Sequence, residues 1–203
     1  MRALVTGFDA FDGAAVNASI AAVRRLPARI GELAITTIEL PTSFARAPAA
    51  LSNAIADCKP DVVLCVGEAG GRDALSIERV AINLCNARGA DNDGACPRET
   101  AVVPGGPAAY FSTLPVVEIA DALRAAGLPA EISSDAGTFV CNQVFYTLMR
   151  LAATAGHRWR GGFLHVPHAF DAVARPQAGM TLNTITRGIA LALEVSAAQQ
   201  IAA

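Results

Sequence analysis

The sequence predicts an α/β fold: a single domain with an open, mainly parallel, twisted sheet flanked by helices, an α/β/α sandwich. Short runs rich in valine, isoleucine and leucine alternate along the chain with longer stretches in which apolar residues recur at helical spacing. The short runs are apolar on both faces, which is typical of buried strands in a parallel sheet covered by helices. At 203 residues the chain is long enough for one continuous core, and no internal repeat or low-complexity tract divides it. We therefore expect residues 1–203 to form one domain.

The first strand is expected at the N-terminus, where the apolar run "RALVT" precedes a glycine. In order, the apolar runs predict strands at Arg2–Thr6, Ala34–Glu39, Val62–Val66, Glu131–Ser133 and Gly162–His165. The helical spacing predicts helices at Ser19–Arg25, Phe44–Ala56, Val116–Ala126, Val140–Ala155 and Thr181–Ala203. One segment breaks the alternation: a strand-like run from Leu75 to Leu84, then a long excursion rich in glycine, asparagine, aspartate and proline. Insertions of that length are more often functional or oligomer-forming than idle.

Composition and charge exclude several classes of protein. A formal net charge of −2, a pI near 5.9 and the lack of a basic run argue against nucleic-acid binding. The longest uncharged stretch, Thr100–Val117, is interrupted by prolines and glycines, so no membrane span is predicted. The N-terminus lacks the pattern of a signal peptide, and we expect a cytoplasmic protein.

The cysteines and glycines give no sign of a metal or cofactor. The five cysteines are odd in number and none are spaced as a CxxC pair, so we expect free thiols rather than a zinc cluster or a disulfide scaffold. The segment "GEAGGR" does not match GxGxxG, and no GK[ST] loop is present. No metal and no cofactor is expected.

Ligands of open α/β sheets bind beyond the carboxyl ends of the strands, which directs attention to "GFDAFDG", "GEAGGR", "SDAGTFVC" and "HVPH". Cys141 lies at the start of a predicted helix. With Thr138 as the N-cap, Cys141 would be the third helical residue, where unpaired backbone amides favour the thiolate and lower the pKa. The other four cysteines show no such activating context, although an inert, packed thiol is the common role of any cysteine.

A cysteine nucleophile needs a base, and His165, at the end of a predicted strand, is favoured over His168 in the following loop and His157 in a polar connection. Glu78 is a carboxylate in an otherwise apolar run and would orient His165 by accepting its ring N–H. The alternative for Glu78 is an ion pair with Arg79 or Arg72. The pattern alone indicates a cysteine hydrolase as one candidate.

The same residues belong to longer motifs. The segment "GEAGGRDALSIERVAIN" resembles the glutamate signature of the pyroglutamyl-peptidase I family, also called pyrrolidone-carboxylate peptidases. "ISSDAGTFVCN" is similar to the cysteine signature of that family, "GFLHVP" to its histidine segment and "VVPGGPAAYFSTLP" to its insertion. The resemblance covers nearly the whole chain. It implies removal of N-terminal pyroglutamyl residues from peptides through a thioester, with Cys141 as nucleophile, His165 as general base and acid, and Glu78 as orienting group.

The resemblance also implies a pocket for a neutral lactam, which needs an apolar slot and a few hydrogen bonds. Its residues would be Phe8 and Phe11 as walls, Asn17 as a polar contact, and Phe139 and Val140 beside the nucleophile. Core packing is the alternative for Phe8 and Phe11. Family members commonly carry glutamine at the position of Glu68 and glycine at that of Asp12.

Glu68 is therefore the main departure from the family pattern. A buried charge beside a lactam requires protonation or a partner, and Glu68 either faces the lactam or points away and pairs with Arg72.

Other functions and an assembly state follow from the same observations. Open α/β folds host many activities, so a nucleoside-phosphorylase-like transferase and a noncatalytic or altered-specificity binding protein are alternatives. The former needs a phosphate site, and no basic cluster lies near the glycine turns. The resemblance and the insertion around Asp91 to Pro107 predict a homo-oligomer, a homotetramer, with the insertion at an interface.

Overall fold

A computed structural model describes residues 1–156, 158–170 and 179–198. Its main sheet has seven strands in the order β2-β3-β1-β4-β9-β5-β8. The strands are β2 (Arg29–Ile30), β3 (Leu33–Leu40), β1 (Arg2–Phe8), β4 (Val62–Glu68), β9 (Arg160–Val166), β5 (Leu75–Glu78) and β8 (Ala130–Ser133). Pairs β3–β1, β1–β4, β4–β9 and β5–β8 are parallel, whereas β2–β3 and β5–β9 are antiparallel. The prediction of an open, mainly parallel sheet is confirmed.

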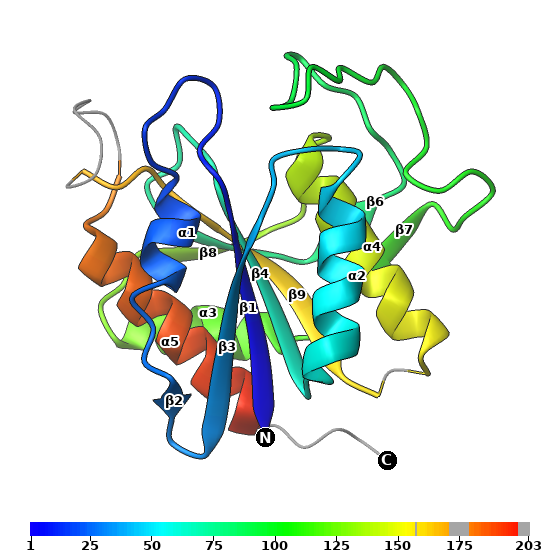
Figure 1. The fold of residues 1–203 in the computed structure, drawn as a ribbon. Helices are drawn as coiled ribbons and strands as arrows, with labels where there is room; N and C mark the ends of the chain where they lie inside the picture. The colour runs from blue at the N-terminus through cyan, green and yellow to red at the C-terminus, as the bar shows by residue number, and fades with distance from the viewer. Residues whose placement is uncertain (157, 171–178, 199–203) are drawn as a thin grey trace.

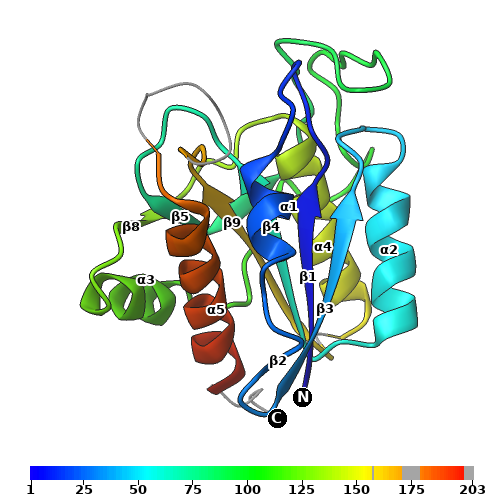
Figure 2. The ribbon, with the colours of Figure 1, turned by 60° about the vertical axis from the view of Figure 1, so that its left-hand side comes forward.

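Helices cover both faces of the sheet. The helices are α1 (Ala18–Val23), α2 (Ala47–Cys58), α3 (Val116–Ala125), α4 (Val140–Thr154) and α5 (Leu182–Ala198). Figure 1 and the turned view in Figure 2 show α1, α3 and α5 on one face and α2 and α4 on the other. Each face has its own apolar core, one around Leu164 and Ile189 and the other around Phe163 and Phe145. The arrangement is the predicted α/β/α sandwich.

The strand-like run from Leu75 to Leu84 is not one strand, and that prediction is wrong. The chain leaves the main sheet after Glu78, and β6 (Val80–Ile82) pairs instead with β7 (Ala109–Phe111) in a separate two-stranded sheet. The run stays apolar because β5 is fully buried next to α3, whereas β6 is partly buried against α4. Strands β2 and β7 were not predicted, since two or three residues leave no periodicity to detect.

The helix predictions hold within a few residues, except at α2. That helix begins at Ala47 rather than Phe44, because Pro48 occupies its first turn, and it continues to Cys58. The end predicted for the last helix, residues 199–203, lies outside the described residues. Within the described ranges, no helix is long and apolar enough to cross a bilayer.

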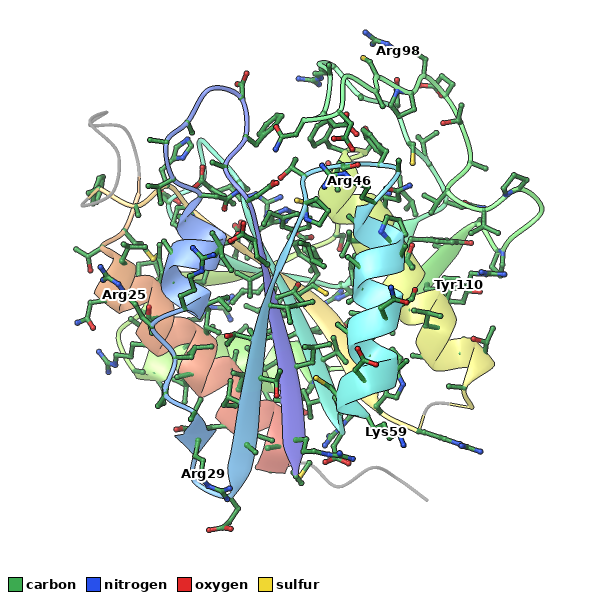
Figure 3. All side chains as sticks on the ribbon, in the orientation of Figure 1. Arg25, Arg29, Arg46, Lys59, Arg98 and Tyr110 are labelled. Atoms are coloured by element: carbon green, nitrogen blue, oxygen red, sulfur yellow. The ribbon has the colours of Figure 1, made fainter. Side chains whose placement is uncertain are left out.

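The loops that follow β1 and β3 meet the insertion at the carboxyl end of the parallel strands, at the top of Figure 1. The side chain of Asn92 in the insertion donates to the carbonyl of Ala10 at 2.9 Å, and Asp91 accepts from the amide of Phe44 at 2.7 Å. Arg46, at the loop end of α2 in Figure 3, pairs with Asp93 at 2.7 Å. The insertion therefore braces the loops that surround this end of the sheet.

Candidate active site

Cys141 lies in the first turn of α4, but one position earlier than predicted. The N-cap is Phe139, so Cys141 is the second helical residue, and the Thr138 hydroxyl instead donates to the carbonyl of Asn86 at 2.7 Å. The side chain of Asn142 fixes this end of the helix by pairing with both backbone groups of Ile82, at 2.9 and 3.0 Å.

The sulfur of Cys141 packs against the end of β4. A Cβ at Gly67 would lie 2.9 Å from Sγ and 2.8 Å from the ring of Phe163, distances that real Cβ atoms essentially never show. Glycine at this position is therefore required for the sulfur to approach the strand. Gly67 is the register partner of His165 on β9, and neighbouring strands lie about 4.8 Å apart. The cysteine and histidine predicted to act together thus meet around the same two strand ends.

The electrostatics of Cys141 differ from the sequence-based expectation. Burial, followed by the negative charge of Glu78, raises the pKa of Cys141 to about 12, and these effects outweigh the lowering by Arg72 and by the cysteine's own backbone amide. The prediction that the helix terminus lowers this pKa is wrong for the free protein. A thiolate must therefore be formed by proton transfer to a neighbouring base.

His165 and Glu78 form a buried pair. Nδ1 of His165 lies 2.7 Å from Oε1 of Glu78, and the two side chains are 5% and 0% exposed. They come from antiparallel strands, with Glu78 opposite Phe163, so its carboxylate reaches His165 diagonally across one face of the sheet. A carboxylate accepts hydrogen bonds, so the proton on Nδ1 points to Glu78 and leaves Nε2 as a base.

Arg72 also pairs with Glu78, which is one of the two ion pairs that the sequence suggested for this carboxylate. Its Nη1 donates to the same Oε1 at 2.8 Å, while Nη2 donates to the carbonyl of Asp135. Burial acts to raise the pKa of Glu78, but the hydrogen bond and charge of His165, with Ser133 and Arg72, lower it overall. Glu78 is therefore an anion at neutral pH, and it serves both partners at once.

A small pocket of about 60 Å³ opens beside Cys141. Its lining contains every residue predicted to bind substrate: Phe8, Phe11, Asn17, Glu68, Phe139 and Val140, together with Thr42 and Cys141. The ring of Phe139 lies between those of Phe11 and Phe44, with centroids 5.1 Å from each. Phe8 is 2% exposed and belongs to the apolar core while also lining the pocket.

Thr42 was missed from the sequence, although it follows the end of β3 and the rule that ligands bind beyond strand ends could have found it.

Asn17 lines the pocket while capping α1: its Oδ1 accepts from the amide of Ser19 at 3.0 Å and its Nδ2 donates to the carbonyl of Asp9 at 3.1 Å. Only the second N–H of that amide is left for a ligand. Asp12 has φ +54°, a left-handed conformation that glycine adopts more readily.

Glu68 does not pair with Arg72, so that alternative is wrong. Its Oε2 accepts from the amide of Ala18 at 2.5 Å, and its Oε1 lies 2.8 Å from Nδ1 of His168. His168, expected to be secondary to His165, contacts the pocket through this carboxylate. His157 lies outside the described residues.

The other four cysteines are free thiols that the structure does not place at this pocket. Burial raises the pKa of Cys65 to about 12 and that of Cys85 to about 11, which leaves both neutral. Cys96 is exposed in the insertion, and Cys58 lies at the end of α2.

Comparison with known proteins gives one consistent family. A sequence profile described as pyroglutamyl peptidase matches residues 1–200. Pyrrolidone-carboxylate peptidase 1 of Ralstonia nicotianae is 49% identical over 200 residues, which cover 97% of this chain and 93% of that protein. Pyrrolidone-carboxylate peptidase of Streptococcus pyogenes is 45% identical over 195 residues, covering 95% and 91% of the two chains.

Solved structures agree. Pyroglutamyl peptidase I of Bacillus amyloliquefaciens superposes with a TM-score of 0.93 at 41% identity, covering 98% of this chain and 97% of that one. A variant of pyrrolidone carboxyl peptidase from the hyperthermophile Pyrococcus furiosus has a TM-score of 0.95 at 35% identity, covering 99% and 100%.

Proposed function

Because the chain belongs to the pyroglutamyl peptidase family, we propose that it removes N-terminal pyroglutamyl residues from peptides with Cys141 as its nucleophile. In this proposal His165 is the general base and acid, and Glu78 orients it. The observation that carries these roles is the buried Glu78–His165 contact at 2.7 Å, placed beside the strand end against which the sulfur of Cys141 packs.

The reaction begins with transfer of the thiol proton to Nε2 of His165. The sulfur attacks the carbonyl of the pyroglutamyl residue, and the oxyanion forms next to the backbone amides in the first turn of α4. His165 then returns the proton to the departing peptide amine, leaving a thioester on Cys141. A water molecule that gives its proton to His165 hydrolyses the thioester and releases pyroglutamate.

Glu78 supports each of these steps through the charge on His165. Its carboxylate stabilises the imidazolium that exists after each proton transfer, because the two groups are buried and 2.7 Å apart. The same charge raises the pKa of Cys141, so the thiolate is favoured only together with a protonated His165. The nucleophile therefore exists as part of an ion pair and not as an isolated thiolate.

The lactam of the substrate would occupy the pocket beside Cys141. It is a neutral ring, and the walls offered to it are the aromatic rings of Phe8, Phe11 and Phe139, together with the side chain of Val140. Polar contacts would come from Asn17 and Thr42, while Glu68 lines the same pocket with both of its oxygens already engaged by Ala18 and His168.

Hydrolysis of a fluorogenic pyroglutamyl amide, compared with the glutamyl and prolyl amides, tests the function. We expect turnover of the pyroglutamyl amide alone, near-complete loss in Cys141→Ser, and no loss in the matched control Cys96→Ser. Equal cleavage of the prolyl amide, or an active Cys141→Ser variant, would contradict the proposal. A reactive Cys141 without any turnover would favour the role of a binding protein.

We further propose a cytoplasmic homotetramer with the segment 91–107 at a subunit interface. A reducing compartment suits five cysteines that are all unpaired among the described residues. Two surface features near the insertion support an interface there: Phe111 on β7 is 68% exposed, and a cavity of about 280 Å³ lies between the insertion residues Val102 and Val103 and helices α2 and α4. Light scattering should show a mass well above 20.9 kDa; a fully active monomer would contradict the tetramer.

A further inference from the structure

The loop after β9 contacts the substrate pocket through a histidine that the proposed mechanism does not use. His168 follows the general base by three residues, and its Nδ1 lies 2.8 Å from Oε1 of Glu68. The ring is held on its other side as well, since a Cβ at Gly70 would lie 2.5 Å from Nε2. Although 43% of the side chain is exposed, its position is thus fixed between a carboxylate and a glycine.

Glu68 links this contact to the loop that carries the pocket residues Phe11 and Asn17. Its second oxygen accepts from the amide of Ala18 at 2.5 Å, at the start of α1 and next to Asn17. Its side chain is only 14% exposed. A carboxylate can only accept, so both contacts use donors: the backbone N–H of Ala18 and the Nδ1–H of His168.

These two contacts account for a carboxylate beside a pocket built for a neutral ring. A part-buried negative charge with one backbone donor would be poorly compensated, and it would turn toward any donor that the lactam offers. With His168 in place, both oxygens are engaged by groups outside the apolar slot.

We propose that His168 is a positioning residue for substrate binding that acts through Glu68, holding this carboxylate against the start of α1 and out of the lactam slot. The inference rests on the proposed function, because it concerns the pocket that would bind the pyroglutamyl ring. It assigns His168 no contact with the reacting atoms. The effect is expected on KM, with little change in kcat.

Substitutions at both positions separate this role from a general effect on packing. His168→Phe keeps a planar ring beside Gly70 but removes the donor, and we expect KM for a pyroglutamyl amide to rise roughly 10-fold. His168→Asn places an amide N–H near the former Nδ1, and it should restore most of the loss. Glu32→Gln, at a fully exposed carboxylate between β2 and β3, is the matched control for changes at Glu68 and should have no effect.

The double variant is the decisive case. In Glu68→Gln the carbonyl oxygen must face the Ala18 amide, so the NH₂ group faces His168, which can accept at Nδ1 in its other neutral tautomer. Glu68→Gln therefore has no charge that needs His168. We expect His168→Phe to raise KM much less in the Glu68→Gln background than in the native one.

Dissociation constants for 2-pyrrolidone, measured by calorimetry in the Cys141→Ser background, repeat the cycle without catalysis. Strong coupling between positions 68 and 168 in the binding of 2-pyrrolidone would support the proposal for His168. It would do so even if no pyroglutamyl amide were cleaved; that lack of cleavage would refute only the proposed function. Additive effects of the two substitutions, a fall in kcat at unchanged KM, or failure of His168→Asn to restore KM would overturn the proposal for His168.

Discussion

Glu78→Gln is expected to slow catalysis by weakening the ion pair of thiolate and imidazolium, although it removes a charge that raises the pKa of Cys141. The substitution keeps the size of the side chain, and its carbonyl can still accept from Nδ1 of His165. What is lost is the negative charge that supports the imidazolium at 2.7 Å and the guanidinium of Arg72 at 2.8 Å.

The magnitude follows from the loss of that charge. A hydrogen bond to a charged partner contributes about 1.5–3 kcal/mol, and a neutral one about 1 kcal/mol. The imidazolium form of His165 should therefore be less favourable by about 1–2 kcal/mol, which corresponds to a fall in kcat of roughly 5-fold to 30-fold. The same substitution should lower the pKa of Cys141, because the charge of Glu78 raises it in the native protein.

Two assays on the same preparation test this pair of effects. Steady-state hydrolysis of a pyroglutamyl amide gives kcat, and the rate of alkylation of Cys141 by iodoacetamide between neutral and strongly alkaline pH gives its titration. Glu32→Gln is the control, and thermal unfolding checks that the variant is folded. Unchanged kcat would refute the orienting role of Glu78, and a thiol titration that moves to higher pH would contradict the effect of its charge on Cys141.

Three further predictions follow from the site. His165→Ala should abolish the alkylation of Cys141 at neutral pH, as seen by peptide mass mapping, because the isolated thiol has a pKa of about 12; undiminished labelling would contradict a base at His165. The folded pKa of Cys65 is raised to about 12, above the unfolded value of about 8.5, so its contribution to stability is complete below that value and is lost as the pH rises toward 12. Chemical unfolding at pH 8 and pH 10.5 should therefore show a smaller alkaline loss in Cys65→Ala than in the native protein, and an equal loss would argue against a buried neutral thiol. Gly67→Ala should lower the free energy of unfolding by only about 1–3 kcal/mol but remove most of the turnover, because the new methyl group displaces Sγ of Cys141. Normal kinetics of this variant would show that the sulfur does not need to lie close to β4.

The layers of the fold could be predicted because each helix and long strand has a periodic pattern of its own. The antiparallel placement of β5 beside β9 could not, since the register between Glu78 and Phe163 depends on pairing across 85 positions of the chain. The break after Glu78 was hidden for a related reason. The apolar run continues into β6, but β6 packs against α4 and does not join the main sheet.

At the candidate site, the residues that follow strand ends and the pairing of Glu78 with His165 were predictable from the sequence, whereas several other contacts were not. Cys141, His165 and the pocket residues other than Thr42 follow from motif and position. The bridge that Arg72 makes between Glu78 and the carbonyl of Asp135, and the contact between Glu68 and His168, depend on the way the fold brings separate segments of the chain together.

The pKa of Cys141 was predicted in the wrong direction because a helix terminus is visible in a sequence, whereas burial and the distance to Glu78 are not. The expected N-cap failed for a similar reason. The Thr138 hydroxyl finds a partner in Asn86, which is remote in the sequence, and leaves the helix to begin after Phe139.

Trapping of the acyl-enzyme tests most directly that Cys141 carries the reaction. An activated pyroglutamyl ester should acylate Cys141 rapidly, and an acid quench stops hydrolysis of the thioester. Peptide mapping should then place one pyroglutamyl group on the peptide that contains Cys141, in the native protein and in Cys96→Ser but not in Cys141→Ser. A pyroglutamyl group on another residue, or native turnover by Cys141→Ser, would contradict the assignment.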